Sequence, residues 1–405
     1  MEIVRNPKIE WLKLKWLFIA TSILLAVVGT VSLTIRGLNL GIDFVGGTLV
    51  YVKFKSTPDI ERVRRLLVAA QINADGVTRF DAPAKNQLQI RLSRVADEAE
   101  RDLNEDSREV LRVLKEEFDK DSPKAGVDLN NTTAYVLTGC FRNVAQGLSC
   151  LEEAAGGLQA SQLAEDYDVE PESLARKVID YRTDQGGILQ DESQLEEIGL
   201  PDEIVKTLKE HFYLGSFSVL SVESVGPKVG RELQEKAQNA ILFSLTGIVI
   251  YIGFRFRGIA YGLAAIVALF HDVFITLGFF SIFDKEISLT VIAGLLTVVG
   301  YSINDTIVVF DRVRENLRLM RRADFASVIN MSINQTLNRT ILTSGMTFVA
   351  VMALYLLGGQ VLNGFSFALV VGVLVGTYSS IAIASPIVHW WQLFREGRQA
   401  RSLRM

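Results

Sequence analysis

The sequence predicts a multi-pass α-helical membrane protein that has six transmembrane helices and one large water-soluble α/β domain. Of its 405 residues, 49% are hydrophobic and 22% are charged, so the two kinds must be segregated along the chain. Residues 36–239 contain 25 Lys and Arg against 36 Asp and Glu, whereas the remainder contains 17 against 10. The remainder also includes six long apolar stretches. These observations exclude a disordered chain, a fibrous protein and a basic nucleic-acid-binding protein.

The six apolar stretches are the predicted transmembrane helices. Crossing a hydrocarbon core of about 30 Å takes roughly 20 helical residues, and each stretch approaches or exceeds that length. They are predicted at residues 12–35, 237–254, 259–283, 288–310, 340–357 and 365–394. The first is expected to be a permanent anchor, because its apolar run is too long for a cleaved signal and continues into a domain at Arg36.

The cations of the short segments predict the orientation, because cytoplasmic loops retain Lys and Arg. Sixteen Lys and Arg lie in the amino end, in the connections after the second and fourth spans, and in the basic tail 395–405. The short connections on the opposite side contain only Lys285. Both termini, including the N-terminal segment 1–11, are therefore predicted to be cytoplasmic, and residues 36–236 are predicted to form an exported domain.

The exported domain is predicted to alternate strands and helices. Apolar residues at Leu88, Ile90 and Leu92 alternate with polar ones, as in a half-buried strand, and Asp59 has the character of a helix N-cap. Strands are predicted at 48–54, 77–81, 88–92 and 217–224, and helices after Asp59 and at 98–118. The resulting order β-α-β-β-α-β predicts a ferredoxin-like fold.

Residues 121–214 form an insert that this arrangement does not need. The insert contains 18 acidic and 7 basic residues, and the amphipathic run that follows Gly186 and Gly187 predicts helices. Its acidity and its exported side argue against nucleic-acid binding. It also contains the two cysteines, Cys140 and Cys150. A disulfide and two free thiols both remain open, because sequence spacing does not supply the Cα distance that a bridge requires.

The sequence has no recognisable catalytic or metal-binding motif. It lacks a Gly-rich phosphate loop ending in Lys-Ser/Thr, a His-Glu-x-x-His motif and a Cys-x-x-Cys pair, and its three histidines are scattered. We therefore expect neither an enzyme nor a bound metal or cofactor. Any energy that the protein uses must come from a partner or from an ion gradient.

Ionisable residues inside the apolar spans are the candidate functional residues, because each costs roughly 2.5 to 3.5 kcal/mol at a helix centre. Asp272 follows His271 in the third span, Asp305 follows Asn304 in the fourth, and Arg339 precedes the fifth. Antiparallel neighbours would place Asp305 and Arg339 at similar depth, with Asn304 able to hydrogen-bond the carboxylate. This set predicts proton coupling, with Asp272 and His271 in support. The alternative is a static buried ion pair that holds two helices together.

Five motifs occur in order along almost the whole chain. They are Gly41-Ile42-Asp43-Phe44-Val45-Gly46-Gly47-Thr48, Val222-Glu223-Ser224-Val225-Gly226-Pro227-Lys228-Val229-Gly230, His271-Asp272-Val273, the long stretch from Gly300 to Asn316, and Asn338-Arg339-Thr340-Ile341-Leu342-Thr343-Ser344. These motifs resemble the SecD/SecF family of protein-export subunits, on the SecF side, within the wider group of resistance-nodulation-division exporters. Asp43 lies beside glycines just outside the first span, where a turn or an anchoring role is expected.

The resemblance implies an accessory subunit of the bacterial Sec machinery in the inner membrane. Such a subunit would work with a separate SecD chain and the SecYEG channel, and would use the proton gradient to promote preprotein translocation. YajC and membrane lipid are further implied partners, whereas nucleic acid is not. The insert is longer than the usual outer domain of the family. Two alternatives stay open: a half-transporter for a small molecule or lipid, and a non-conducting scaffold of the translocon.

Overall fold

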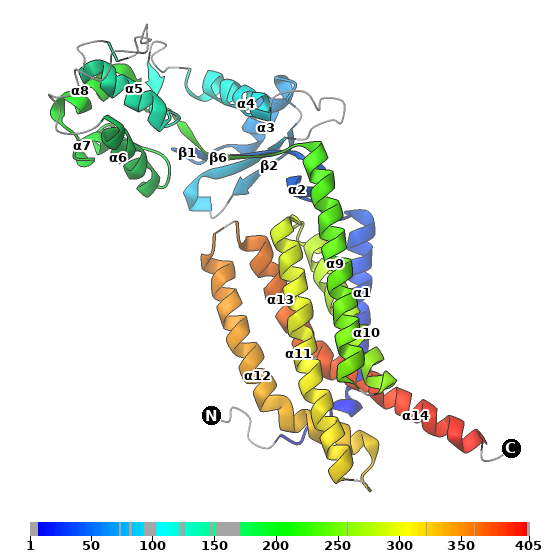
Figure 1. Cartoon of the computed structure of the whole chain (residues 1–405). Helices are drawn as coiled ribbons and strands as arrows, with labels where there is room; N and C mark the ends of the chain where they lie inside the picture. Colours follow the sequence, from blue (N-terminus) through cyan, green and yellow to red (C-terminus); the bar gives the residue numbers. More distant parts are fainter. Residues whose placement is uncertain are drawn as a thin grey trace. The chain divides into compact units, whose positions relative to one another are not determined.

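The computed structural model of the chain describes residues 7–72, 74–80, 83–92, 103–120, 122, 126–145, 149–150, 171–256, 258–320, 322–359 and 361–402. The chain divides into two compact units. The membrane unit comprises Met1–Val45 and Lys228–Met405, and the α/β unit comprises Gly46–Pro227. Figure 1 shows a bundle of long helices in the first unit and a sheet with shorter helices in the second.

The membrane unit contains six helical segments that are long and apolar enough to cross a membrane, as the sequence predicts. Five of them are single helices: α1 (Lys15–Ile35), α9 (Pro227–Arg255), α10 (Ile259–Ile282), α11 (Leu289–Leu319) and α12 (Phe325–Leu357). The sixth is a continuous segment that consists of α13 (Asn363–Ser379), a π-helical turn (Ser380–Ala384) and α14 (Ser385–Ser402). The short helix α2 (Ile42–Val45), which is not a span, follows α1. Helix α12 begins well before the predicted span at 340–357. The reason is a polar N-cap, because the Asp324 side chain accepts hydrogen bonds from the backbone N–H groups of Ala326 and Ser327.

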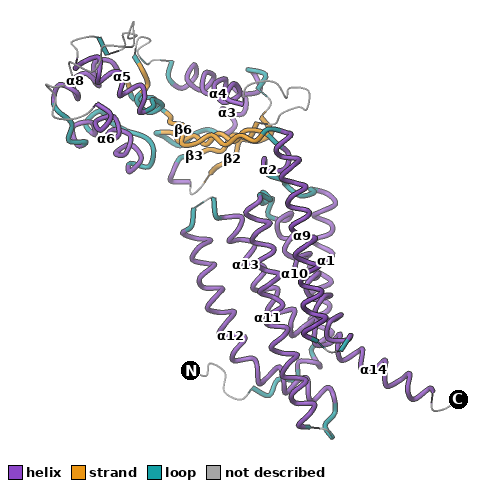
Figure 2. Tube along the Cα trace, viewed as in Figure 1, coloured by secondary structure: helices purple, strands orange, loops and turns teal. Residues whose placement is uncertain are grey.

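Helix α11 packs against α10, α12 and α13, and the contact with α13 is especially close (Figure 2). Gly372 and Gly376 of α13 lie against Val298 and Ser302 of α11, where an added Cβ would overlap the neighbouring side chains. Small residues at this spacing allow two helix backbones to approach in an apolar environment. The same approach brings the polar Ser302 toward the middle of the bundle.

The segment that follows α1 is tied to the start of α11. The backbone N–H of Gly41 donates to the carbonyl of Ile287 over 2.8 Å. The Asp43 carboxylate accepts a hydrogen bond from the backbone N–H of Leu289 over 2.9 Å, at the N-terminus of α11, where a negative charge is favoured. Phe44 is buried in the same apolar cluster as residues of α10, α11 and α13. Asp43 therefore anchors this segment to a membrane helix.

The α/β unit is built on a four-stranded antiparallel sheet with two helices. Along the chain its elements are β1 (Gly47–Phe54), α3 (Ile60–Ala69), β2 (Ala74–Phe80), β3 (Gln87–Leu92), α4 (Leu103–Phe118) and β6 (Phe217–Val225). The strands lie in the order β2-β3-β1-β6, and Val50 of β1 is opposite both Ile90 and Val222. Leu88, Ile90 and Leu92 are buried as their alternation predicts. Asp81 and residues 98–102, which were included in the predicted elements, lie outside the described residues.

The insert has an apolar core of its own. Its described elements are β4 (Val127–Asp128), α5 (Ala134–Ala145), α6 (Pro171–Asp184), α7 (Gln194–Glu197), α8 (Asp202–His211) and β5 (Phe212–Tyr213). Leu137, Phe141 and Leu208 are fully buried in this core, which shares no residue with the core of the four-stranded sheet. Cys140 and Cys150 form a disulfide, with 4.3 Å between their Cα atoms. The insert is therefore helical, with an additional short parallel strand pair.

Polar contacts attach the insert to the sheet. The side-chain amide of Asn131 donates to the carbonyl of Phe217 over 2.9 Å, and its oxygen accepts from the N–H of Val219 over 2.8 Å. This side chain thus hydrogen-bonds one backbone C=O and one backbone N–H of β6, which is an edge strand of the sheet. The backbone N–H of Ser216 donates to the Asp119 carboxylate over 2.8 Å, so the two ends of the insert are adjacent.

Candidate ion-coupling site

Asp272 of α10 lies in a polar cluster inside the membrane unit. Its side chain is 1% exposed. One carboxylate oxygen accepts hydrogen bonds from the hydroxyls of Ser302 on α11 (2.5 Å) and Ser379 at the end of α13 (2.7 Å). The other oxygen lies 2.9 Å from Nδ1 of His271. Asp272 therefore joins three helices through one carboxylate.

The contact with Asp272 links the tautomer of the His271 ring to the proton of that acid. While Asp272 is ionised, its carboxylate can only accept a hydrogen bond, so Nδ1 of His271 then carries the hydrogen; a protonated Asp272 can instead donate to Nδ1. Nε2 is buried and has no hydrogen-bond partner in the described part of the chain. In the neutral tautomer with the hydrogen on Nδ1, Nε2 is a free acceptor, which is the property that a proton-accepting group needs.

Asp305 of α11 forms the second part of the cluster. It is 2% exposed and lies three residues after Ser302, on the same face of the helix. The hydroxyl of Ser344 on α12 donates to its carboxylate over 2.9 Å. The hydroxyl of Thr377 on α13 also lies near this carboxylate, and it donates to the carbonyl of Val373. The two acids and their hydroxyl partners thus come from α10, α11, α12 and α13.

Two residues expected beside Asp305 have other surroundings. Asn304 is exposed, because successive residues of a helix point about 100° apart, and Ser344 instead hydrogen-bonds the carboxylate. Arg339 is also exposed, and among the described residues no ion pair joins it to Asp305. Arg339 precedes Ser344 by five residues on α12, which places the two side chains on different faces of the helix. The structure therefore does not contain the static ion pair that was one interpretation of the sequence.

Hydroxyl partners suit a carboxyl group that gains and loses a proton. A hydroxyl has one hydrogen to donate and two lone pairs, so it can donate to a carboxylate and accept from a carboxylic acid. A guanidinium can only donate, and it favours the charged form alone. The surroundings of Asp272 and Asp305 can therefore satisfy both protonation states.

A π-helical turn follows directly after Ser379. It spans Ser380–Ala384, and the hydroxyl of Ser385 donates to the carbonyl of Ser380, five residues earlier, over 3.0 Å. Such turns are rare and frequently occur at functional sites. The turn changes the helix register immediately after a residue that hydrogen-bonds Asp272.

Gly46 and Gly47 of the glycine-rich motif belong to the α/β unit. Gly46 has a φ of 80°, which favours glycine, and a Cβ on it would lie 3.0 Å from the Cα of Pro227. The motif around Gly46 and Gly47 therefore meets the motif around Pro227 within the α/β unit. No neighbouring atom restricts a side chain at Gly226 or Gly300, so the structure provides no steric reason for these two glycines.

Sequence reasoning missed Ser302, Ser344, Thr377 and Ser379. Serine and threonine are common in apolar helices, where they hydrogen-bond the preceding turn of the helix, so composition does not single them out. Ser302 and Ser344 did have a local signal, because Ser302 lies three residues before Asp305 within the long fourth-span motif and Ser344 ends the motif that begins at Asn338. Within the described residues no cluster of three or more His, Cys, Asp or Glu could hold a metal ion.

Comparison with known proteins finds the same family throughout. Residues 204–393 match the family described as protein export membrane protein SecD/SecF, C-terminal, and residues 31–58 match the SecD/SecF GG motif. The chain is 40% identical to protein translocase subunit SecF of Koribacter versatilis, over 100% of this chain and 96% of that protein. It is 34% identical to the corresponding subunit of Desulfurispirillum indicum, over 95% and 92% of the two chains.

A solved structure has a similar fold. The crystal structure of SecDF from Thermus thermophilus, described as a translocon-associated membrane protein, aligns with a TM-score of 0.64 at 28% identity. The alignment covers 96% of this chain and 39% of that one. The six helical spans, the α/β unit and these matches define a multi-pass membrane protein of the SecD/SecF export class. Within that class, the chain belongs to the SecF family of protein translocase subunits.

Proposed function

We propose that the chain is an accessory subunit of the bacterial Sec translocon. In this proposal it works with a separate SecD chain and uses the proton gradient to promote preprotein translocation through the SecYEG channel. Membership of the SecF family supports the translocon role. The likeness to SecDF, in which this chain aligns with 39% of the length, supports a SecD partner.

The buried carboxylate of Asp305 is the observation that supports proton coupling. An acid at this position is costly in an apolar bundle, and no basic side chain of the described chain pairs with it. Its hydrogen-bond donor is a hydroxyl, which is compatible with both the charged and the protonated form. Asp305 is therefore the proposed proton carrier. Asp272, together with His271, is a proposed second protonation site in the same bundle.

Arg339 is proposed to act on Asp305 in a second conformation of the helical bundle. Its guanidinium is exposed in this structure, whereas Asp305 is buried. A rotation or shift of α12 that brings Arg339 toward Asp305 would favour release of the proton, because an adjacent cation stabilises the charged carboxylate. Withdrawal of Arg339 would favour proton uptake. The proposed cycle therefore alternates the neighbours of one carboxyl group between a hydroxyl and a cation.

The substitution Asp305→Asn tests the proposal. The chain and SecD would be reconstituted with SecYEG in vesicles, and preprotein translocation would be measured with and without an imposed proton gradient. Because Asn preserves size and cannot titrate, we expect translocation to fall to the level seen without a gradient. Co-purification with SecD should be unchanged.

Asp311→Asn is the matched control. It makes the same chemical change two turns further along α11, at a half-exposed acid that pairs with Arg255. We expect it to retain the response to the gradient. Full gradient-stimulated translocation by Asp305→Asn, with normal SecD association, would show that Asp305 is structural and would refute the coupling role.

A further inference from the structure

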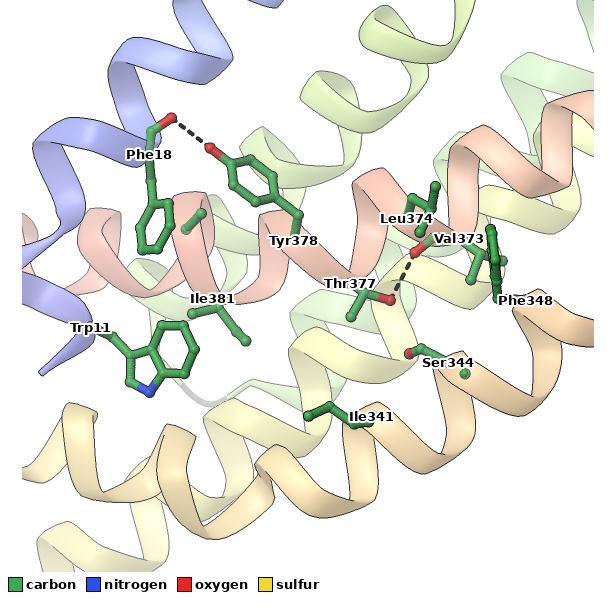
Figure 3. Close-up of a pocket in the computed structure, with 12 residues that line it drawn as sticks. Trp11, Phe18, Ile341, Ser344, Phe348, Val373, Leu374, Thr377, Tyr378 and Ile381 are labelled. Carbon is green, nitrogen blue, oxygen red and sulfur yellow. Dashed lines mark hydrogen bonds between the residues drawn. The ribbon is translucent and has the colours of Figure 1, made fainter. Parts of the chain in front are cut away.

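A cavity of about 390 Å³ lies in the membrane unit between α12, α13 with its π-helical turn, and the start of α1 (Figure 3). Its volume is within the range of about 300 to 1,000 Å³ that is usual for small-molecule sites. Most of its wall is aromatic or aliphatic. The side chains that matter for its chemistry are Trp11, Phe18, Phe348, Tyr378, Ser344 and Thr377.

Three hydroxyls line the cavity, and all have already used their hydrogens; that of Tyr378 donates to the carbonyl of Phe18. Ser344 donates to the Asp305 carboxylate over 2.9 Å, and Thr377 donates to the carbonyl of Val373 over 2.8 Å. Figure 3 shows these two side chains on facing helices. A hydroxyl has only one hydrogen, so what Ser344 and Thr377 can offer a ligand is lone pairs. The polar part of the cavity therefore selects a hydrogen-bond donor.

When Asp305 is ionised, the charge next to the cavity is negative. Asp305 lies one hydrogen bond behind Ser344, is buried, and has no ion-pair partner among the described residues. A carboxylate in an environment of low dielectric attracts a cation far more strongly than it would in water. The site therefore favours a donor that also carries positive charge.

Aromatic rings form the other end of the cavity. The indole N–H of Trp11 donates to Asn334 over 2.9 Å, which fixes the ring, and Phe18 meets Tyr378 edge to face at 5.8 Å between centroids. Rings of this kind bury an apolar body and also attract cations through their faces. This end suits the apolar part of the same ligand.

We propose that this cavity is a binding site for an amphiphilic monocation, namely a primary ammonium group on an apolar body. The ammonium donates hydrogen bonds to Ser344 and Thr377, and its charge is balanced by Asp305. The apolar body lies against Trp11, Phe18 and Phe348. This site does not depend on the role of the chain in protein export, because binding is defined by the cavity alone.

Binding to the full chain in phosphatidylcholine nanodiscs tests the site. Three radiolabelled probes of matched shape would be compared by equilibrium dialysis: phenylpentylamine, phenylpentanol and phenylpentanoate. We expect saturable binding of the amine, binding of the alcohol that is about tenfold weaker or more, and no saturable binding of the anion. Empty nanodiscs measure partition into lipid, and equal retention of all three probes would overturn the proposal.

Two variants locate the bound amine. Asp305→Asn should reduce the affinity for the amine to that for the alcohol. Gly345 lines the cavity, and a Cβ on it would meet open space, so Gly345→Phe should fill the cavity and abolish saturable binding. Met346→Phe is the matched control. Met346 is 72% exposed and does not line the cavity, so this variant adds the same ring outside it. Equal binding by the two phenylalanine variants would refute the site.

Discussion

Each acid inside the bundle takes its hydrogen bonds mainly from hydroxyl groups. Asp272 accepts from Ser302 and Ser379, and Asp305 accepts from Ser344. The sequence predicts the acids, because a charge in an apolar stretch stands out along the chain. It does not predict Ser379 or Ser344, because the spacing within one helix contains no information about the facing residue of another.

The Asp272 cluster should contribute to stability as a unit. Ser302→Ala removes a donor from a buried carboxylate, and we expect a loss of about 1 to 3 kcal/mol. Asp272→Asn should also destabilise the bundle. The double variant should cost less than the sum of the two single changes, because both remove the same contact. Thermal unfolding in detergent measures the three changes, and strict additivity would show that the contact contributes nothing.

Asp128 gives the α/β unit a dependence on pH. Burial raises the pKa of its carboxyl above the usual 3.8, although hydrogen bonds from Asn131, Gly215 and Asn130 oppose this shift. A raised pKa means that the folded state holds the proton more tightly than the unfolded chain. The stability that Asp128 contributes is therefore complete below pH 3.8 and is lost as the pH rises through the higher value of the folded state.

The comparison with Asp128→Asn isolates this effect. The variant does not titrate at this position, so the wild-type advantage in the free energy of unfolding should decrease between pH 3.8 and neutrality. Denaturation of both proteins across this range measures the slope. An advantage that grows with pH would show that the hydrogen bonds to the carboxylate outweigh its burial.

Among the helices and strands, those with a regular local sequence pattern could be predicted. Strict alternation of apolar and polar residues predicted β3, and long apolar runs predicted the membrane helices. Asp59 is the N-cap of α3, as expected. Strands β4 and β5 could not be predicted, because two residues are too few to show a period of two. The π-helical turn at Ser380–Ala384 is likewise absent from the apolar pattern, which continues through it without interruption.

Removing the insert tests its independence. We expect a chain with Lys120 joined to Gly215 to accumulate in the membrane and to retain its association with SecD, because the core of the sheet contains no residue of the insert. The adjacent Asp119 and Ser216 make the new junction short. Membrane fractionation and co-purification with SecD measure both properties.

Asn131→Ala in the full chain is the companion variant. It leaves the insert in place and removes only the side chain that bonds the outer edge of β6, so we expect a loss of about 1 to 3 kcal/mol. If the shortened chain fails to accumulate although Asn131→Ala is well tolerated, the insert supports the sheet by some means other than this edge. The prediction of an independent insert would then be wrong.

For the whole molecule, the charge pattern predicts sidedness. Sixteen cations lie in the short segments of one side and one lies in those of the other. A reporter that is active only outside the cytoplasm should therefore be active when fused within the insert, residues 121–214, and inactive when fused after Asn316. The reverse result would contradict both the orientation and the proposed function.

The disulfide of the insert connects this orientation with the biogenesis of the protein. Disulfides persist in oxidising compartments, whereas cytosolic thiols are kept reduced. Under the proposed topology, the insert is carried across the membrane before Cys140 and Cys150 can join, so the chain is itself an exported substrate before it assists others. The state of these two thiols, measured by alkylation in intact cells, therefore reports how many copies have completed their own crossing.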